Sequence, residues 1–186
     1  DVQPCLDYFE KLFKALTNHK KGAYCTVFRL HLDPCWTNDP NLPLVGDGGE
    51  HNISQFSQLR LKKYWRSLYT ELIKKALAHG LYVVIRPPGV CPHDIKVGDA
   101  YQEYLKTVWG TVTSFTQYLN NNAGKVSIEL ANEPVDVYDS KGAKNSSVAL
   151  RDYFQPIVDV IRENGFKGII WVPGSGWQSW YNNYAK

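Results

Sequence analysis

The sequence predicts an α/β fold in which helices and parallel strands alternate along one domain, residues 1–186. Two observations carry this prediction. Apolar residues recur at helical spacing in four segments, and each segment is followed by a short apolar or β-branched run typical of a strand. Strands that alternate with helices pair in parallel through right-handed crossovers. An apolar share of 44% over 186 residues suffices for one core.

Turn and capping residues separate the predicted elements. Asp99 can cap the third helix, and Ser146 or Ser147 the fourth. A long polar loop, 33–55, follows the first strand. The predicted elements are, in chain order, helix 6–16, strand 24–32, helix 61–76, strand 81–85, helix 100–119, strand 126–131, helix 150–161 and strand 168–172.

Two architectures fit this alternation, a doubly wound open sheet and a barrel. No glycine-rich phosphate-binding turn follows any predicted strand, which argues against a nucleotide-binding open sheet. Polar and aromatic residues gather after the strands, where (β/α)₈ barrels keep their sites. A complete barrel needs eight strands in roughly 250 residues. The chain therefore predicts about half of a (β/α)₈ barrel, to be completed by other polypeptide.

Composition excludes several classes of function. The net charge of +3 is mild and no lysine- or arginine-rich run is present, so nucleic-acid binding is not expected. No apolar stretch approaches the ~20 residues that cross a bilayer. The cysteines match no metal-binding spacing. A bridge between Cys35 and Cys91 is one hypothesis, since both follow neighbouring predicted strands, but the pairing stays open.

One motif carries chemistry. The third predicted strand ends at Asn132-Glu133-Pro134, and Pro134 cannot continue a central strand. A carboxyl group at a rigid strand end suits the acid/base of a retaining glycosidase, which protonates the leaving oxygen while a second carboxylate attacks the sugar. Asn132 can donate to a sugar hydroxyl beside the scissile bond. Glu129, two pleats deeper on the same face, reads as a structural carboxylate.

At these residues the chain resembles glycoside hydrolase family 5, which includes many endo-β-1,4-glucanases. Residues 28–31 resemble the second barrel strand, 79–85 the third and 168–172 the fifth, so the chain corresponds to strands two to five with their helices. The resemblance is specific at Arg29 and at Asn132-Glu133-Pro134. It implies a partial catalytic domain that acts on cellulose or related β-glucans by double displacement.

The resemblance also implies roles for individual residues. Glu133 would be the catalytic acid/base, Asn132 a hydroxyl-binding partner and Arg29 a cation that steadies the nucleophilic carboxylate. His31 shares the face of Arg29 by strand alternation and is a candidate to line the site, although a core histidine fits equally. His93 could replace the histidine with which the family ends strand three, a place occupied here by Arg86.

The family's nucleophilic glutamate belongs to strand seven, which these residues do not reach. We therefore expect the isolated chain to be inactive in hydrolysis. Trp36 and Trp177 follow strands, and their ring faces suit packing against sugar rings, although either could anchor a loop instead. Both are candidate glucan platforms.

Alternatives remain open at this stage. An endo-β-1,4-mannanase of the same clan would use the same residues, and a non-catalytic carbohydrate-binding fragment would explain the absent nucleophile. Partners are expected to be a β-glucan poly- or oligosaccharide and the remaining part of the barrel. No metal or organic cofactor is implied, since two carboxyl groups suffice. Because polymers do not enter cells, a secreted or cell-surface location is expected.

Overall fold

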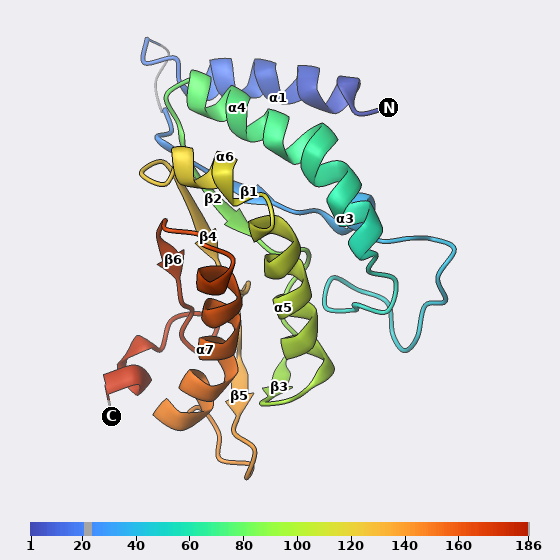
Figure 1. Cartoon of the computed structure of the whole chain (residues 1–186), viewed down its shortest axis with the longest axis vertical. Helices are drawn as coiled ribbons and strands as arrows, with labels where there is room; N and C mark the ends of the chain where they lie inside the picture. Colours follow the sequence, from blue (N-terminus) through green and yellow to red (C-terminus); the bar gives the residue numbers. More distant parts are fainter. Residues whose placement is uncertain (21–23, 186) are drawn as a thin grey trace.

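The computed structural model describes residues 1–20 and 24–185. Within these ranges the main sheet has four parallel strands in the order β1-β2-β4-β6 (Figure 1). The strands are β1 (Val27–His31), β2 (Tyr82–Arg86), β4 (Val126–Glu129) and β6 (Ile170–Trp171). Each pairs in parallel with the next. The predicted alternation of helices and parallel strands is therefore confirmed.

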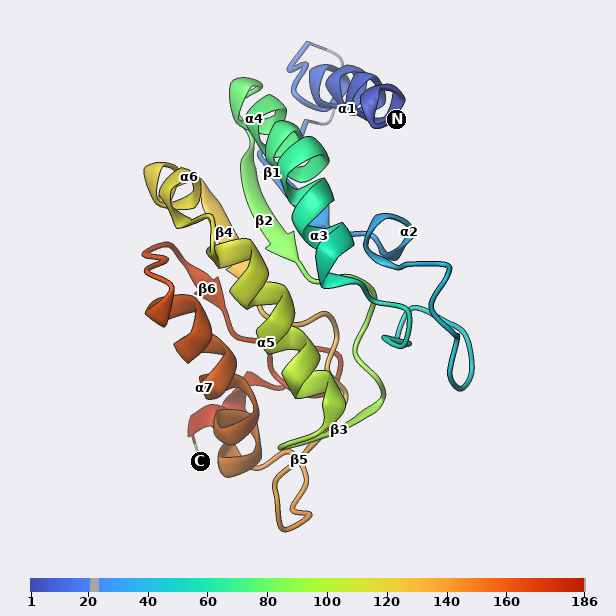
Figure 2. The same cartoon turned by 45° about the vertical axis from the view of Figure 1, so that its right-hand side comes forward.

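Helices cover one face of this sheet, with α3 and α4, then α5, then α7 lying side by side in front of the strands (Figure 2). The helices are α1 (Gln3–Leu16), α2 (Pro34–Thr37), α3 (Gln58–Tyr64), α4 (Thr70–Ala78), α5 (Ala100–Thr113), α6 (Thr116–Asn121) and α7 (Ser147–Glu163). A π-helical turn, η1 (Trp65–Tyr69), joins α3 to α4, and a 3₁₀ turn, η2 (Tyr181–Ala185), lies near the C-terminus. Sequential parallel strands with helices on one face form part of a (β/α)₈ barrel.

The prediction of a single helix over 100–119 is wrong toward its C-terminal end. Helix α5 ends at Thr113, Phe115 has non-helical backbone angles, and α6 starts at Thr116. Near the break, the Thr113 hydroxyl donates to the Trp109 carbonyl and the Ser114 hydroxyl to the Thr111 carbonyl. Hydroxyl groups that bond to nearby carbonyls compete with the helical ladder and weaken it. Apolar periodicity alone does not register this competition.

A second, smaller sheet was not predicted. Strands β3 (Asp94–Lys96) and β5 (Asp136–Tyr138) pair in parallel within the segments that follow β2 and β4. Each has only three residues, too few for an alternating pattern to be recognised. The pair joins these two segments beyond the ends of the main strands.

The two faces of the main sheet differ in composition. Phe28, Val83 and Ile85 point toward the helices, whereas alternate residues line the inner face. At the amino ends of the strands that inner face is apolar and open, since Val27 is 50% and Tyr82 52% exposed. At the carboxyl ends it is charged. The strands therefore direct their polar side chains to one end of the sheet.

The hypothesis of a Cys35–Cys91 disulfide is wrong. All four cysteines lie among the described residues and are free thiols. Cys35 is exposed on α2, whereas Cys91 is buried after β2, where its amide donates to the Asn132 carbonyl. Burial raises the pKa of the Cys91 thiol to about 12. This thiol is therefore a structural group with little nucleophilic character.

Both predicted helix caps are confirmed. The Ser146 hydroxyl accepts from the Ala149 amide at 3.1 Å, and the Asp99 carboxylate accepts from the Gln102 amide at 2.7 Å. Asp99 also accepts from the Tyr153 hydroxyl at 2.9 Å, which ties the start of α5 to α7. One side chain thus satisfies a helix end and a neighbouring phenol.

We expect Asp99→Ala to lower the free energy of unfolding by about 2 kcal/mol, because it removes an N-cap and leaves the Tyr153 hydroxyl without its acceptor. Denaturant titration followed by circular dichroism measures this. Asp99→Asn keeps an acceptor oxygen and should lose less than half as much. Equal losses in both variants would show that the charge, and not the cap, is what stabilises the chain.

Candidate active site

An arginine–carboxylate network links two strands at the charged end of the sheet. Arg29 on β1 donates through Nε to Glu129 Oε2 at 2.7 Å and through Nη2 to Glu129 Oε1 at 2.6 Å. The same Nη2 donates to Asn132 Oδ1 at 2.6 Å. These bonds to Glu129 raise the pKa of Arg29 above its usual range. Such two-point pairing fixes the orientation of both groups.

Glu129 and Asn132 are both buried. The Glu129 side chain is 8% exposed against 45% for Arg29, and Asn132 is buried. Because Asn132 Oδ1 accepts from Arg29, its amide nitrogen is left as the group available to a ligand. The network thus supplies an oriented N–H donor next to Glu133.

Glu133 stands at the rim of this network. It is exposed, and no hydrogen bond to its carboxylate is found in the described part of the chain. Its φ is +55°, a left-handed conformation that is uncommon for residues other than glycine. Such backbone strain concentrates at functional sites. The adjoining Asn132 and Pro134 are both buried, so the backbone that carries the exposed carboxylate is fixed on both sides.

A cavity of about 360 Å³ opens beside Glu133. It lies between the long loop before α3 and the segments that follow β2, β4 and β6, and its volume is within the range of small-molecule sites. The residues that line it are His51, Val90, Cys91, Pro92, His93, Glu133, Val135 and Trp177. Three predicted site residues, Glu133, His93 and Trp177, therefore share one cavity. Trp177 is 63% exposed, which leaves its ring free for a ligand.

Arg29, His31 and Trp36 line a different cavity, of about 260 Å³, on the β1 side. The His31 ring accepts from the Gly89 amide at Nε2, 3.0 Å away. Trp36 on α2 packs against the Tyr64 ring, with centroids 4.9 Å apart, and is partly buried. The structure therefore brings Trp36 near Arg29 but not into the cavity of Glu133.

Three residues near the site were not assigned a role from the sequence. Arg86 follows Tyr82 and Val84 on the inner face and pairs in register with His31, so strand alternation could have placed it. His51 comes from the long loop and Gln178 from the segment after β6. Loop residues carry no periodic signal, and pattern reasoning has no means to find them.

One cluster has the composition of a metal site. The ligand atoms of His93, Asp94 and Asp136 lie within 4.8 Å of one another. However, the Asp136 carboxylate already accepts from Lys144 at 3.3 Å and from the Asn145 amide at 2.9 Å. A carboxylate paired with lysine is a poor cation ligand. The cluster is better explained as two local ion pairs, His93 with Asp94 and Asp136 with Lys144, which the pairing of β3 with β5 brings together.

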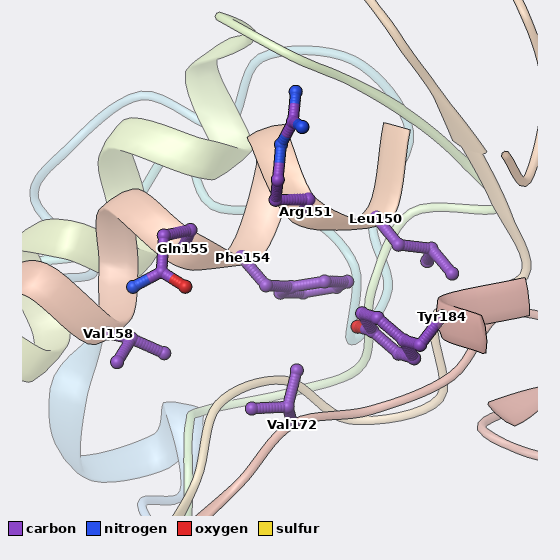
Figure 3. Close-up of a pocket in the computed structure, with 7 residues that line it drawn as sticks. All are labelled: Leu150, Arg151, Phe154, Gln155, Val158, Val172 and Tyr184. Atoms are coloured by element: carbon purple, nitrogen blue, oxygen red, sulfur yellow. The ribbon is translucent and has the colours of Figure 1, made fainter. Parts of the chain in front are cut away.

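A groove of about 310 Å³ lies away from these residues, between α7 and η2 (Figure 3). Phe154 from α7, Val172 after β6 and Tyr184 from η2 face one another across it (Figure 3). The groove shares no lining residue with the cavity of Glu133. Among the described residues, no helix is long and apolar enough to span a membrane.

Comparison with known proteins bears on this site. A model described as cellulase, glycosyl hydrolase family 5, matches residues 10–186. No protein with curated function matches the sequence significantly. A glycosyl hydrolase family 5 cellulase from an Icelandic hot spring isolate superposes with a TM-score of 0.56 at 20% identity, over 95% of this chain and 45% of that one.

Two further solved structures are similar. The catalytic domain of Thermobifida fusca endoglucanase Cel5A gives a TM-score of 0.54 at 20% identity, over 95% of this chain and 45% of that chain. Thermotoga maritima Cel5A in complex with cellobiose gives 0.53 at 15% identity, over 93% and 46%. At these identities the likeness shows the fold. The chain spans less than half the length of these structures.

We expect His31 to titrate below its ordinary pKa of 6.5, because burial and, second, the positive charge of Arg86 disfavour the imidazolium. NMR titration of the His31 ring measures this. Arg86→Gln removes the like charge but leaves the burial, so the pKa should rise part of the way toward 6.5. A pKa above 6.5 in the unmodified chain would contradict the geometry described.

Proposed function

The chain belongs to the cellulase family, glycosyl hydrolase family 5, and we propose that it supplies the acid/base of an enzyme that hydrolyses internal β-1,4-glucosidic bonds in cellulose or related β-glucans. One observation carries the proposal: Glu133 projects from the carboxyl end of β4, beside Asn132 and the Arg29–Glu129 pair. Carboxyl ends of barrel strands are where such enzymes keep their catalytic groups.

The reaction would proceed by double displacement. In the first step Glu133 transfers its proton to the glycosidic oxygen as a second carboxylate attacks the anomeric carbon, so the leaving chain departs as an alcohol. In the second step Glu133 takes a proton from water, which attacks the same carbon and releases the second carboxylate. The Asn132 amide would donate to a hydroxyl of the sugar being cleaved.

The attacking carboxylate is proposed to come from the remaining part of the barrel. Retaining enzymes place their two carboxyl groups about 5–5.5 Å apart. Glu129, the buried carboxylate at the end of β4, already accepts from Arg29 and Gln178. Asp33 caps α2, and Asp136 pairs with Lys144. The open apolar inner face at Val27 and Tyr82 supports burial against further strands.

Binding of the glucan would involve both cavities. Trp177 offers an exposed ring beside Glu133, and His93 lies in the same cavity. His31 and Trp36 would border the site from the β1 side, next to Arg29. Because glucans of this kind are polymers, the enzyme would act outside the cell or on its surface.

The choice between glucan and mannan depends on how the 2-hydroxyl is held. A solved Thermotoga maritima Cel5A structure contains mannotriose and another contains cellobiose. The proposal favours glucan, and comparing the full-length enzyme on carboxymethylcellulose and galactomannan tests it. Faster turnover of galactomannan would instead support the mannanase alternative.

We expect the isolated chain of residues 1–186 to release no reducing sugar from carboxymethylcellulose, because the attacking carboxylate is proposed to lie in the remaining part of the barrel. In the full-length enzyme, Glu133→Ala should lower kcat by about 10²–10⁴-fold, the usual contribution of a general acid or base. With dinitrophenyl β-cellobioside, whose leaving group needs no proton, added azide should restore turnover of Glu133→Ala by attacking the glycosyl-enzyme in the second step, and it should yield a β-glycosyl azide. Glu163→Ala, on α7, is the matched control and should retain full activity.

Two results would count against the proposal. Robust hydrolysis by the isolated chain would show that its own carboxylates suffice. Full activity of Glu133→Ala would remove the acid/base role, and binding of cello-oligosaccharides without hydrolysis by the full-length protein would leave a carbohydrate-binding protein.

A further inference from the structure

The segment between β6 and η2 is bonded to the backbone on both sides of Glu133. Its contacts come from two residues, Gly176 and Gln178. The bonds are Gly176 N to Val135 O at 2.9 Å, Gln178 N to Pro134 O at 3.4 Å and Gln178 Nε2 to Ala131 O at 3.3 Å. The last contact comes from a side chain and the other two from the main chain. The segment therefore surrounds the turn that presents the carboxylate.

Three residues in this region have left-handed backbones. The φ angles are +55° at Glu133, +56° at Trp177 and +67° at Gln178. None is glycine, so each conformation carries strain and persists only where its surroundings enforce it. The strained residues are the proposed acid/base, the exposed tryptophan of its cavity and Gln178, which bonds to Ala131 and Pro134 on either side of Glu133.

The loop has little freedom to relax this strain. Gly174 and Gln178 form one antiparallel bridge, and Ser175 and Trp180 form another. A side-chain carbon on Gly176 would overlap the Trp180 ring, so the loop closes only with glycine there. The turn is thus narrow, and the side chain of Gln178 extends from it to Glu129 and Ala131.

Gln178 also reaches the arginine network. Its Nε2 donates to Glu129 Oε1 at 3.0 Å, the oxygen that accepts from Arg29 Nη2. The side-chain amide of Gln178 therefore donates to the buried carboxylate of Glu129 and to the Ala131 carbonyl, and its backbone amide donates to the Pro134 carbonyl. Among the described contacts, this is the side-chain link between the loop of Trp177 and β4.

We propose that Gln178 is a positioning residue for acid catalysis, which holds Glu133 and Trp177 in a fixed relation by bonding the β6–η2 loop to Glu129 and Ala131. The inference rests on the proposed function. A general acid has to lie within hydrogen-bond reach of the glycosidic oxygen, and a shift of about 1 Å can cost up to 100-fold in rate. Gln178 would act through Glu133 without contacting the sugar.

The test uses Gln178→Leu in the full-length enzyme, because leucine keeps the bulk and removes the amide. The matched control is Gln155→Leu on α7, whose amide donates to the exposed Asp159 at 2.8 Å. Two substrates are compared: cellotetraose, whose leaving group needs a proton, and dinitrophenyl β-cellobioside, whose leaving group does not. The measured quantities are kcat and KM for each.

We expect Gln178→Leu to lower kcat on cellotetraose by about 10-fold to 100-fold. For the aryl glycoside, the rate of the first step, in which the enzyme is glycosylated, should change by under about 3-fold. The pre-steady-state burst of dinitrophenol measures that rate. Gln155→Leu should change neither. Equal losses on both substrates would overturn the proposal in favour of a general structural role. Unchanged kinetics on both would overturn it outright.

A second measurement covers the case in which the variant folds poorly. Amide hydrogen exchange should become faster at Gly176 in Gln178→Leu while α5 and α7 keep their protection. Unchanged exchange at Gly176 would contradict the positioning role. The azide experiment on Glu133→Ala separates the two proposals: if it fails, the proposed function fails, whereas a positive azide result with unaltered Gln178→Leu kinetics refutes this inference alone.

Discussion

The pair between Arg29 and Glu129 is the interaction on which the charged end of the sheet depends. Two strands that are not adjacent, β1 and β4, meet through it across the inner face. A carboxylate that is 8% exposed is costly to bury unless donors surround it, and Arg29 supplies two hydrogen bonds. Because Arg29 also orients Asn132, loss of this one pair would disturb both the buried charge and the amide beside Glu133.

Two carboxylates, one at the end of β4 and one in the turn that follows it, have different surroundings. Glu129 accepts three hydrogen bonds, two from Arg29 and one from Gln178, and its side chain is almost fully buried. Glu133, four residues later, is exposed and borders a cavity. The strand thus holds its own acid, Glu129, as a buried partner of Arg29, whereas Glu133 beyond the strand end stays exposed. The two residues are both glutamates, so the difference between them comes from their surroundings.

The sequence predicted what periodic patterns and local chemistry record. Helix–strand alternation, the cap at Asp99 and the strand-end position of Glu133 follow from spacing and residue type, and the structure has them. The break before α6 was missed because side-chain hydroxyl bonds at Thr113 do not alter apolar spacing. Trp36 could be placed after a strand, but its contact with Tyr64 depends on tertiary packing that no local pattern encodes.

The left-handed backbones show why the rest of the site escaped prediction. A strained φ at Glu133 or Gln178 is unfavourable locally, so propensity argues against it, and only the surrounding bonds make it stable. Those bonds join residues more than 40 positions apart in the chain, such as Gln178 and Ala131. Sequence patterns can therefore locate the residues at the strand ends, such as Glu133. The contacts that hold these residues in place, such as those of Gln178, form only when distant segments pack together.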